Sequence, residues 1–170
     1  MFDILSRIRR VGRLSEPLPA RDTSDTELTA IQRELHNVFG RALCIRHVDA
    51  GSCNGCEREI LSLSNPYYNL EGAGIRFVAS PRHADLLLVT GPVSVNMEDA
   101  LKHTYEAMPE PKWVLAVGDC GACGGIFGAN YAVRGPISDV IPVHAVVNGC
   151  PPSPLAILRG LLHITRHLPS

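Results

Sequence analysis

Three apolar runs in this sequence end with a glycine close to a cysteine, and this repeated ending restricts the fold more than any other feature. The endings are Val48-Asp49-Ala50-Gly51-Ser52-Cys53, Val117-Gly118-Asp119-Cys120 and Val147-Asn148-Gly149-Cys150. Near-continuous apolar runs are typical of parallel strands that are buried on both faces of a sheet. The carboxyl ends of such strands share one edge, where open α/β folds bind their ligands. We therefore expect cysteines that lie far apart in the sequence to meet at this edge.

Strands and helices are predicted to alternate along the chain. The expected strands are 42–48, 75–79, 85–90, 112–117 and 143–147, and the expected helices are 57–64, 95–108, 154–167 and one that runs from Asp25 to a stop at Gly40. Ser153 is a natural cap for the last helix, and Pro154 suits its first position. This order predicts a doubly wound, three-layer α/β domain with a parallel sheet.

Length, composition and charge restrict the function as well as the fold. With 170 residues, of which 45% are hydrophobic, we expect a basic amphipathic segment and linker at 1–23 and a single domain at 24–170. A net charge of -1 and few aromatic residues argue against a nucleic-acid partner. No apolar run approaches the roughly 20 residues that cross a bilayer. Arg9-Arg10 is not followed by the apolar region of an export signal, so we expect a cytoplasmic protein.

Four cysteines are the candidate ligands of a metal centre: Cys53, Cys56, Cys120 and Cys150. Four thiolates suit either zinc or an iron-sulfur cluster, and a redox-active thiol pair is a further alternative. Structural zinc sites usually use two short Cys pairs, whereas only one of the strand-end pairs is short here. The other two ligands stand in glycine-rich loops, where backbone N–H groups approach an anionic cluster closely. These surroundings favour a 4Fe-4S cluster over zinc and over thiol redox chemistry.

The remaining polar and sulfur-bearing residues have simpler interpretations. Cys123 stands three residues after Cys120, a spacing at which it could compete as a ligand or simply pack near the site. Cys44 is expected to be a small core residue, and Asp49 and Asp119 are expected to be acceptors that order their loops. Glu57 and Glu59 are expected on a solvated helix face or in a capping role. His163 and His167, at i and i+4, are expected at the surface. The loop 118–128 lacks the lysine and the glycine spacing of nucleotide-binding loops.

The motifs around these cysteines also resemble those of a known family. They are Gly51-Ser52-Cys53-Asn54-Gly55-Cys56-Glu57, Thr90-Gly91-Pro92, Gly118-Asp119-Cys120 with Gly124-Gly125, and Gly149-Cys150-Pro151-Pro152. In this order they resemble the small subunit of group 4 membrane-bound NiFe hydrogenases, which is similar in turn to the 20 kDa subunit of respiratory complex I. The resemblance implies a flavodoxin-like fold with one 4Fe-4S cluster, held by the four matching cysteines beside the active site of a large subunit.

Within that resemblance, the spacing of the first cysteine pair favours the hydrogenase branch. Complex I subunits have adjacent cysteines here, whereas Asn54 and Gly55 separate Cys53 from Cys56. The short stretch after Cys150 lacks the additional cysteine-rich domain of other hydrogenase small subunits. His144 and Asn148 depart from the acidic residue and the proline that relatives often have. Glu59 matches a family glutamate and is a candidate proton route.

The resemblance also implies partners and a location. They are a NiFe-bearing or related large subunit, a ferredoxin-like iron-sulfur subunit as electron donor, and membrane subunits that translocate ions. The chain would lie peripherally on the cytoplasmic side of the inner membrane and would not be active alone. The alternatives are the cluster subunit of a complex I-like quinone oxidoreductase and a structural zinc-binding module.

Overall fold

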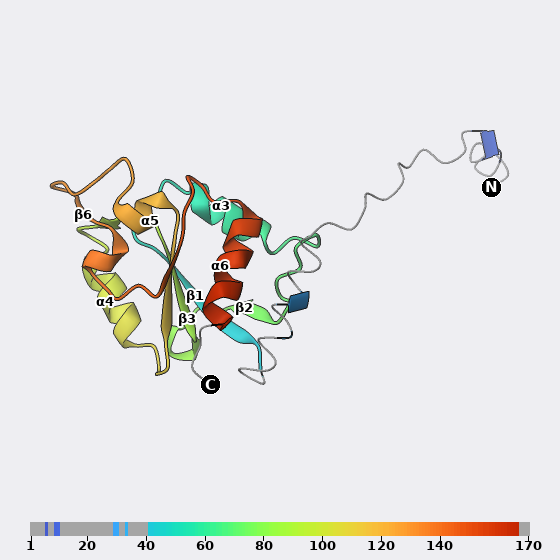
Figure 1. Cartoon of the computed structure of the whole chain (residues 1–170), viewed down its shortest axis with the longest axis horizontal. Helices are drawn as coiled ribbons and strands as arrows, with labels where there is room; N and C mark the ends of the chain where they lie inside the picture. The colour runs from blue at the N-terminus through green and yellow to red at the C-terminus, as the bar shows by residue number, and fades with distance from the viewer. Residues whose placement is uncertain (1–5, 7–8, 11–28, 31–32, 34–40, 167–170) are drawn as a thin grey trace.

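The computed structural model describes residues 6, 9–10, 29–30, 33 and 41–166 and is centred on a five-stranded parallel sheet (Figure 1). Its strands are β1 (Leu43–Asp49), β2 (Ile75–Phe77), β3 (Leu86–Thr90), β5 (Trp113–Val117) and β7 (Ala145–Val147). They lie in the order β2-β1-β3-β5-β7, and every neighbouring pair is parallel. Counted along this sheet alone, the order is 2-1-3-4-5, as in flavodoxin-like folds. The predicted fold class is therefore confirmed.

Helices cover both faces of this sheet and complete three layers (Figure 1). On one face lie α3 (Gly55–Ser62) and α6 (Pro154–Arg166), and on the other lies α4 (Glu98–Glu106). The short helix α5 (Asp119–Cys123) follows β5 directly. An antiparallel ribbon of β4 (Val93–Ser94) and β6 (Val133–Gly135) and the 3-10 helices η1 (Pro81–His83) and η2 (Ile137–Asp139) complete the described elements.

The central strand β3 explains why the sequence has continuous apolar runs. Every residue of β3 is 0% exposed. Successive side chains of a strand point to opposite faces, so both faces of β3 must be apolar. Leu86 and Leu88 pack in the same cluster as Leu158 of α6, whereas Leu87 packs with Leu101 of α4. The sheet thus separates two cores.

Most element positions agree with the sequence expectations. All five strands of the central sheet occur where they were predicted, and α6 begins at Pro154 with the Ser153 hydroxyl accepting a hydrogen bond from the Ala156 N–H at 3.3 Å. The ribbon of β4 and β6 was missed because elements of two or three residues carry no periodicity. The expected helix from Asp25 and the segment 1–23 lie mostly outside the described residues. Within those residues, no helix is long and apolar enough to cross a membrane.

Candidate functional site

Four cysteines from three separate loops line one cavity at the carboxyl edge of the sheet. The cavity has a volume of about 120 Å³. Its lining consists of Ser52, Cys53, Gly55, Cys56, Gly91, Asp119, Cys120, Gly149, Cys150 and Pro151. These residues follow β1, β3, β5 and β7, so four adjacent strand ends contribute to it. The structure brings together the four cysteines that the strand endings predicted to meet.

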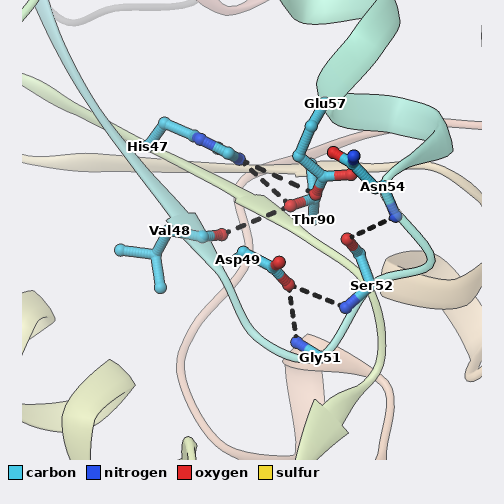
Figure 2. Close-up of polar contacts among 8 residues, drawn as sticks. All are labelled: His47, Val48, Asp49, Gly51, Ser52, Asn54, Glu57 and Thr90. Atoms are coloured by element: carbon cyan, nitrogen blue, oxygen red, sulfur yellow. Dashed lines mark hydrogen bonds and ion pairs between the residues drawn. The ribbon is translucent and has the colours of Figure 1, made fainter.

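Two aspartates hold the cysteine-bearing loops in place. Asp49 Oδ1 accepts hydrogen bonds from the N–H groups of Gly51 at 2.8 Å and Ser52 at 2.7 Å (Figure 2). Asp119 Oδ1 accepts one from the Gly149 N–H at 2.7 Å, which joins the loop after β5 to the loop after β7. The prediction that both aspartates order their loops is confirmed.

Glycines let the cysteine sulfurs lie directly against the backbone. A Cβ atom on Gly118 would lie 2.6 Å from Cys56 Sγ, and one on Gly125 would lie 2.7 Å from Cys120 Sγ. Both glycines also have positive φ angles, +90° and +55°, that other residues rarely adopt. A side chain at either position would displace a thiol from the cavity.

The thiols in this cavity are electrostatically coupled to one another. Burial, and then the charge of Glu57 and the other cavity thiols, raises the pKa of Cys56 to about 12. Burial and Cys150 also raise the pKa of Cys120. Since each thiolate would repel the others, a positively charged centre is needed before all four sulfurs lose their protons. The donor set therefore fits a metal-containing group that neutralises several thiolates at once.

The two other cysteines lie outside the cavity lining. Cys123 is exposed at the end of α5, with its Sγ 3.3 Å from the carbonyl oxygen of Asp119. Cys44 is half-buried on β1. Among the described residues, no group of three or more Cys, His, Asp or Glu side chains is placed to hold a single metal ion. His163 is exposed, as expected, and His167 lies outside the described residues.

Glu57 was expected on a solvated helix face or in a capping role, and the structure contradicts the solvated placement. Its side chain is 15% exposed, and both carboxyl oxygens are buried without a hydrogen-bond partner in the described part of the chain. The sequence Glu57-Arg58-Glu59 resembles a solvent-exposed turn, but His47 of β1 lies beside Glu57, with Nε2 4.0 Å from Glu57 Oε1. Glu59, the candidate proton route, is half-buried and does not line the cysteine cavity.

His47 is a half-buried polar residue that the sequence did not single out. Its Nε2 lies 3.0 Å from Thr90 Oγ1 and 4.0 Å from Glu57 Oε1 (Figure 2). Burial lowers the pKa of His47, although Glu57 and Asp49 oppose this effect. The imidazole is therefore neutral at pH 7 and acts as a hydrogen-bonding group.

Comparisons with known proteins connect this site to a family of redox subunits. Residues 53–164 match the family described as NADH ubiquinone oxidoreductase, 20 Kd subunit. A probable membrane-bound hydrogenase subunit of Pyrococcus furiosus is 41% identical over 143 residues, which cover 82% of this chain and 86% of that protein. A subunit of an NADH-quinone oxidoreductase of Chloroflexus aurantiacus is 45% identical over 108 residues, which cover 63% of this chain and 62% of that protein.

A solved structure supports the same relationship. A chain of the archaeal membrane-bound sulfane sulfur reductase superposes with a TM-score of 0.66 and 33% identity, and the match covers 80% of this chain and 74% of that one. The family match includes all four cavity cysteines, since it begins at Cys53 and extends beyond Cys150. The chain is therefore a member of the family of the 20 kDa subunit of NADH:ubiquinone oxidoreductase, whose relatives include hydrogenase subunits.

Proposed function

We propose that this chain is the electron-transfer subunit of a membrane-associated oxidoreductase and that Cys53, Cys56, Cys120 and Cys150 hold one 4Fe-4S cluster. The observation that carries the proposal is the convergence of these four thiols on one cavity of about 120 Å³. The cavity includes the ends of β1 and β3, which is the position where flavodoxin-like sheets bind their ligands.

The arrangement of the sulfurs supports a cluster rather than a zinc ion. Structural zinc sites usually use two short Cys pairs. In this cavity only Cys53 and Cys56 form a short pair, and Cys120 and Cys150 each come from a separate loop. A polynuclear group with iron and sulfide at its centre suits thiols that are spread around such a space.

A bound cluster would supply one-electron transfer, and the residues of this chain would position and tune it. Asp119 joins the loops that carry Cys120 and Cys150 by a hydrogen bond. The absence of a side chain at Gly118 and Gly125 leaves space for the sulfurs of Cys56 and Cys120, respectively. Cys53 and Cys150 are exposed in the isolated chain. This exposure supports a position for the redox centre at a contact with another subunit, where an electron has only a short distance to travel.

The hydrogenase branch is the better supported assignment of the complex. The Pyrococcus furiosus relative matches over 86% of its length, whereas the quinone oxidoreductase relative matches over 62%. Cys53 and Cys56 are also spaced as in hydrogenases. The proposed partners are a NiFe-bearing large subunit that interconverts protons and dihydrogen, a ferredoxin-like donor and ion-translocating membrane subunits. The proposed location is the cytoplasmic side of the inner membrane.

A quinone oxidoreductase of the complex I type is the second candidate, because the Chloroflexus aurantiacus relative has the higher identity, 45%. The large subunit distinguishes the two. Two Cys-x-x-Cys pairs in the co-purified large subunit, together with stoichiometric nickel, support the hydrogenase. A large subunit without these pairs and without nickel supports quinone or another acceptor.

The ligand assignment is tested by serine variants in the complex purified without oxygen. Cys120→Ser is expected to lose most of the iron held by this chain, because serine is a poor replacement for a thiolate ligand. Cys123→Ser is the matched control, since it lies three residues away and outside the cavity. Equal iron content in the two variants would contradict the ligand set.

Glu59 is retained as a proposed proton route beside the large subunit's active site. Glu59→Gln keeps the shape of the side chain but removes its acidic proton. The variant is expected to slow proton-coupled turnover in the assembled complex. Turnover at the wild-type rate would end this assignment.

A further inference from the structure

A second, larger cavity of about 490 Å³ lies between β1, α3 and the segment after β2. We call it the Glu57 pocket. Arg46, His47 and Glu57 form its polar part, and Ile60, Leu61 and Phe77 belong to its apolar walls. β2 pairs with residues 43–45 of β1 and ends at Phe77, whereas β1 continues to Asp49. From Arg46 onward, β1 therefore has no strand on the side of β2, and the pocket lies there. None of the cavity cysteines lines it.

All the unsatisfied buried side-chain polar atoms of the described residues belong to this pocket. They are Glu57 Oε1, Glu57 Oε2 and Arg46 Nε. A buried polar atom without a partner costs free energy, and folded proteins satisfy nearly all of them. The isolated chain therefore holds an acceptor and a donor without partners at one place. Because these atoms are buried, a partner reaches the Glu57 oxygens only when this side chain turns into the pocket.

The neighbouring groups do not satisfy Glu57. His47 Nε2 is 4.0 Å from Glu57 Oε1, too far for a hydrogen bond, and instead contacts Thr90 Oγ1 at 3.0 Å (Figure 2). Burial also keeps the imidazole neutral at pH 7 by lowering its pKa. No ion pair joins Glu57 to Arg46 in the part of the chain that the structure describes. The carboxyl group thus needs a donor from outside.

The walls of the pocket indicate the shape of that donor. Leu61 is 73% exposed and Phe77 is 36% exposed, so apolar surface extends from the pocket to the outside of the molecule. Arginine and lysine bury an aliphatic stem along such a surface and carry a charged donor at its end.

We propose that the Glu57 pocket is a docking site for a partner subunit, which inserts an arginine or lysine side chain whose head donates to the Glu57 carboxyl group. A backbone carbonyl of the same partner segment would accept the hydrogen bond from Arg46 Nε. The inference rests on membership in a family with relatives that are subunits of membrane complexes. It does not depend on which metal the cysteines hold.

The first test measures how firmly the complex retains this subunit. The complex is purified through a tag on this chain, and the partner subunits that remain after dilution are quantified for wild type, Glu57→Lys and Glu71→Lys. Glu71 is an exposed acid outside the pocket and serves as the matched control. Glu57→Lys places two cations together and is expected to increase dissociation at least about tenfold, whereas Glu71→Lys is expected to leave it unchanged.

The second test identifies the inserted side chain and does not require a folded Glu57 variant. A benzophenone amino acid replaces Leu61 at the mouth of the pocket, and irradiation of the whole complex is followed by peptide mapping. The expected product joins position 61 to a partner peptide that contains an arginine or lysine. Changing that residue to glutamate is expected to restore retention of Glu57→Lys.

Four results would overturn the docking site. One is retention of Glu57→Lys at the wild-type level, and another is a cross-link from position 61 only to this chain. The third is a native mass spectrum in which Glu57→Lys loses a small molecule while every subunit stays in the complex, because this would make the pocket a ligand site. The iron content of the wild-type complex and of Glu57→Lys is measured in the same samples, because Glu57 follows the proposed ligand Cys56. Dissociation of Glu57→Lys at wild-type iron content supports the docking site. Dissociation that occurs only together with iron loss would contradict it.

Discussion

Asp119 and Gly149 are joined by two hydrogen bonds that connect the loops carrying Cys120 and Cys150. Asp119 Oδ1 accepts from the Gly149 N–H at 2.7 Å, and the Asp119 N–H donates to the Gly149 carbonyl oxygen at 2.9 Å. Each of these residues immediately precedes a cavity cysteine. The pairing therefore fixes the separation of two proposed ligands that are distant in sequence.

Removing the Asp119 side chain is expected to weaken this part of the site. Asp119→Ala leaves the Gly149 N–H without its acceptor and is expected to lower the free energy of unfolding by about 1–3 kcal/mol. It is also expected to reduce the iron bound per chain. Asp119→Asn keeps an acceptor oxygen and should retain most of the free energy of unfolding and most of the bound iron. Denaturant titration and iron analysis check the pair, and wild-type values for Asp119→Ala would contradict the structural role.

A methyl group at Gly118 is expected to disturb the site, because its Cβ would lie 2.6 Å from Cys56 Sγ. Gly128→Ala is the matched control: Gly128 also has a positive φ angle, +56°, but a Cβ there would meet nothing within 4 Å. Gly128→Ala bears backbone strain of about 1–2 kcal/mol. Gly118→Ala bears more, because φ +90° with ψ 156° is a conformation that almost only glycine adopts. Only Gly118→Ala is expected to lose bound iron. Equal iron loss in both would show that backbone strain, rather than the approach of the thiol, is responsible.

Acidification is expected to destabilise the folded chain through His47. Burial holds the pKa of His47 below its ordinary value, so below about pH 6.5 the unfolded chain binds this proton more readily than the folded chain. Stability contributed by the neutral imidazole is thus present above about pH 6.5 and is lost as the pH falls toward the folded-state pKa. The free energy of unfolding is measured by urea titration at about pH 8 and about pH 5, on either side of this range. It is expected to differ less between the two pH values for His47→Gln than for wild type.

His83→Gln controls for the loss of a histidine in general, because His83 is exposed. The free energy of unfolding of His83→Gln should differ between the two pH values as much as that of wild type. If His47→Gln and His83→Gln show the same difference, the buried imidazole is not the source of the pH dependence.

The central sheet could be predicted because its central strands β3 and β5 are apolar on both faces. β3 is buried throughout, and its residues 86–89 are all apolar, so its pattern does not suggest another arrangement. The ribbon of β4 and β6 could not be predicted, since strands this short depend on their neighbours and not on local pattern. The cysteine convergence was predictable for a topological reason: parallel strands place their carboxyl ends at one edge.

The burial of Glu57 and His47 could not be predicted from the sequence. Glu57 stands in a charged turn with Arg58 and Glu59, which is the usual pattern of a solvated helix face. Its carboxyl oxygens are buried beside His47 of β1, and the early end of β2 at Phe77 leaves a pocket next to them. These are tertiary effects, and they create a pocket that no local pattern of residues predicts.

The cluster itself is tested most directly by iron, sulfide and zinc analysis of the complex purified without oxygen, combined with a low-temperature EPR spectrum after reduction. We predict about four iron and four sulfide bound by this chain and a reduced 4Fe-4S signal that disappears in Cys120→Ser and persists in Cys123→Ser. Stoichiometric zinc without iron in this chain would contradict the proposed function.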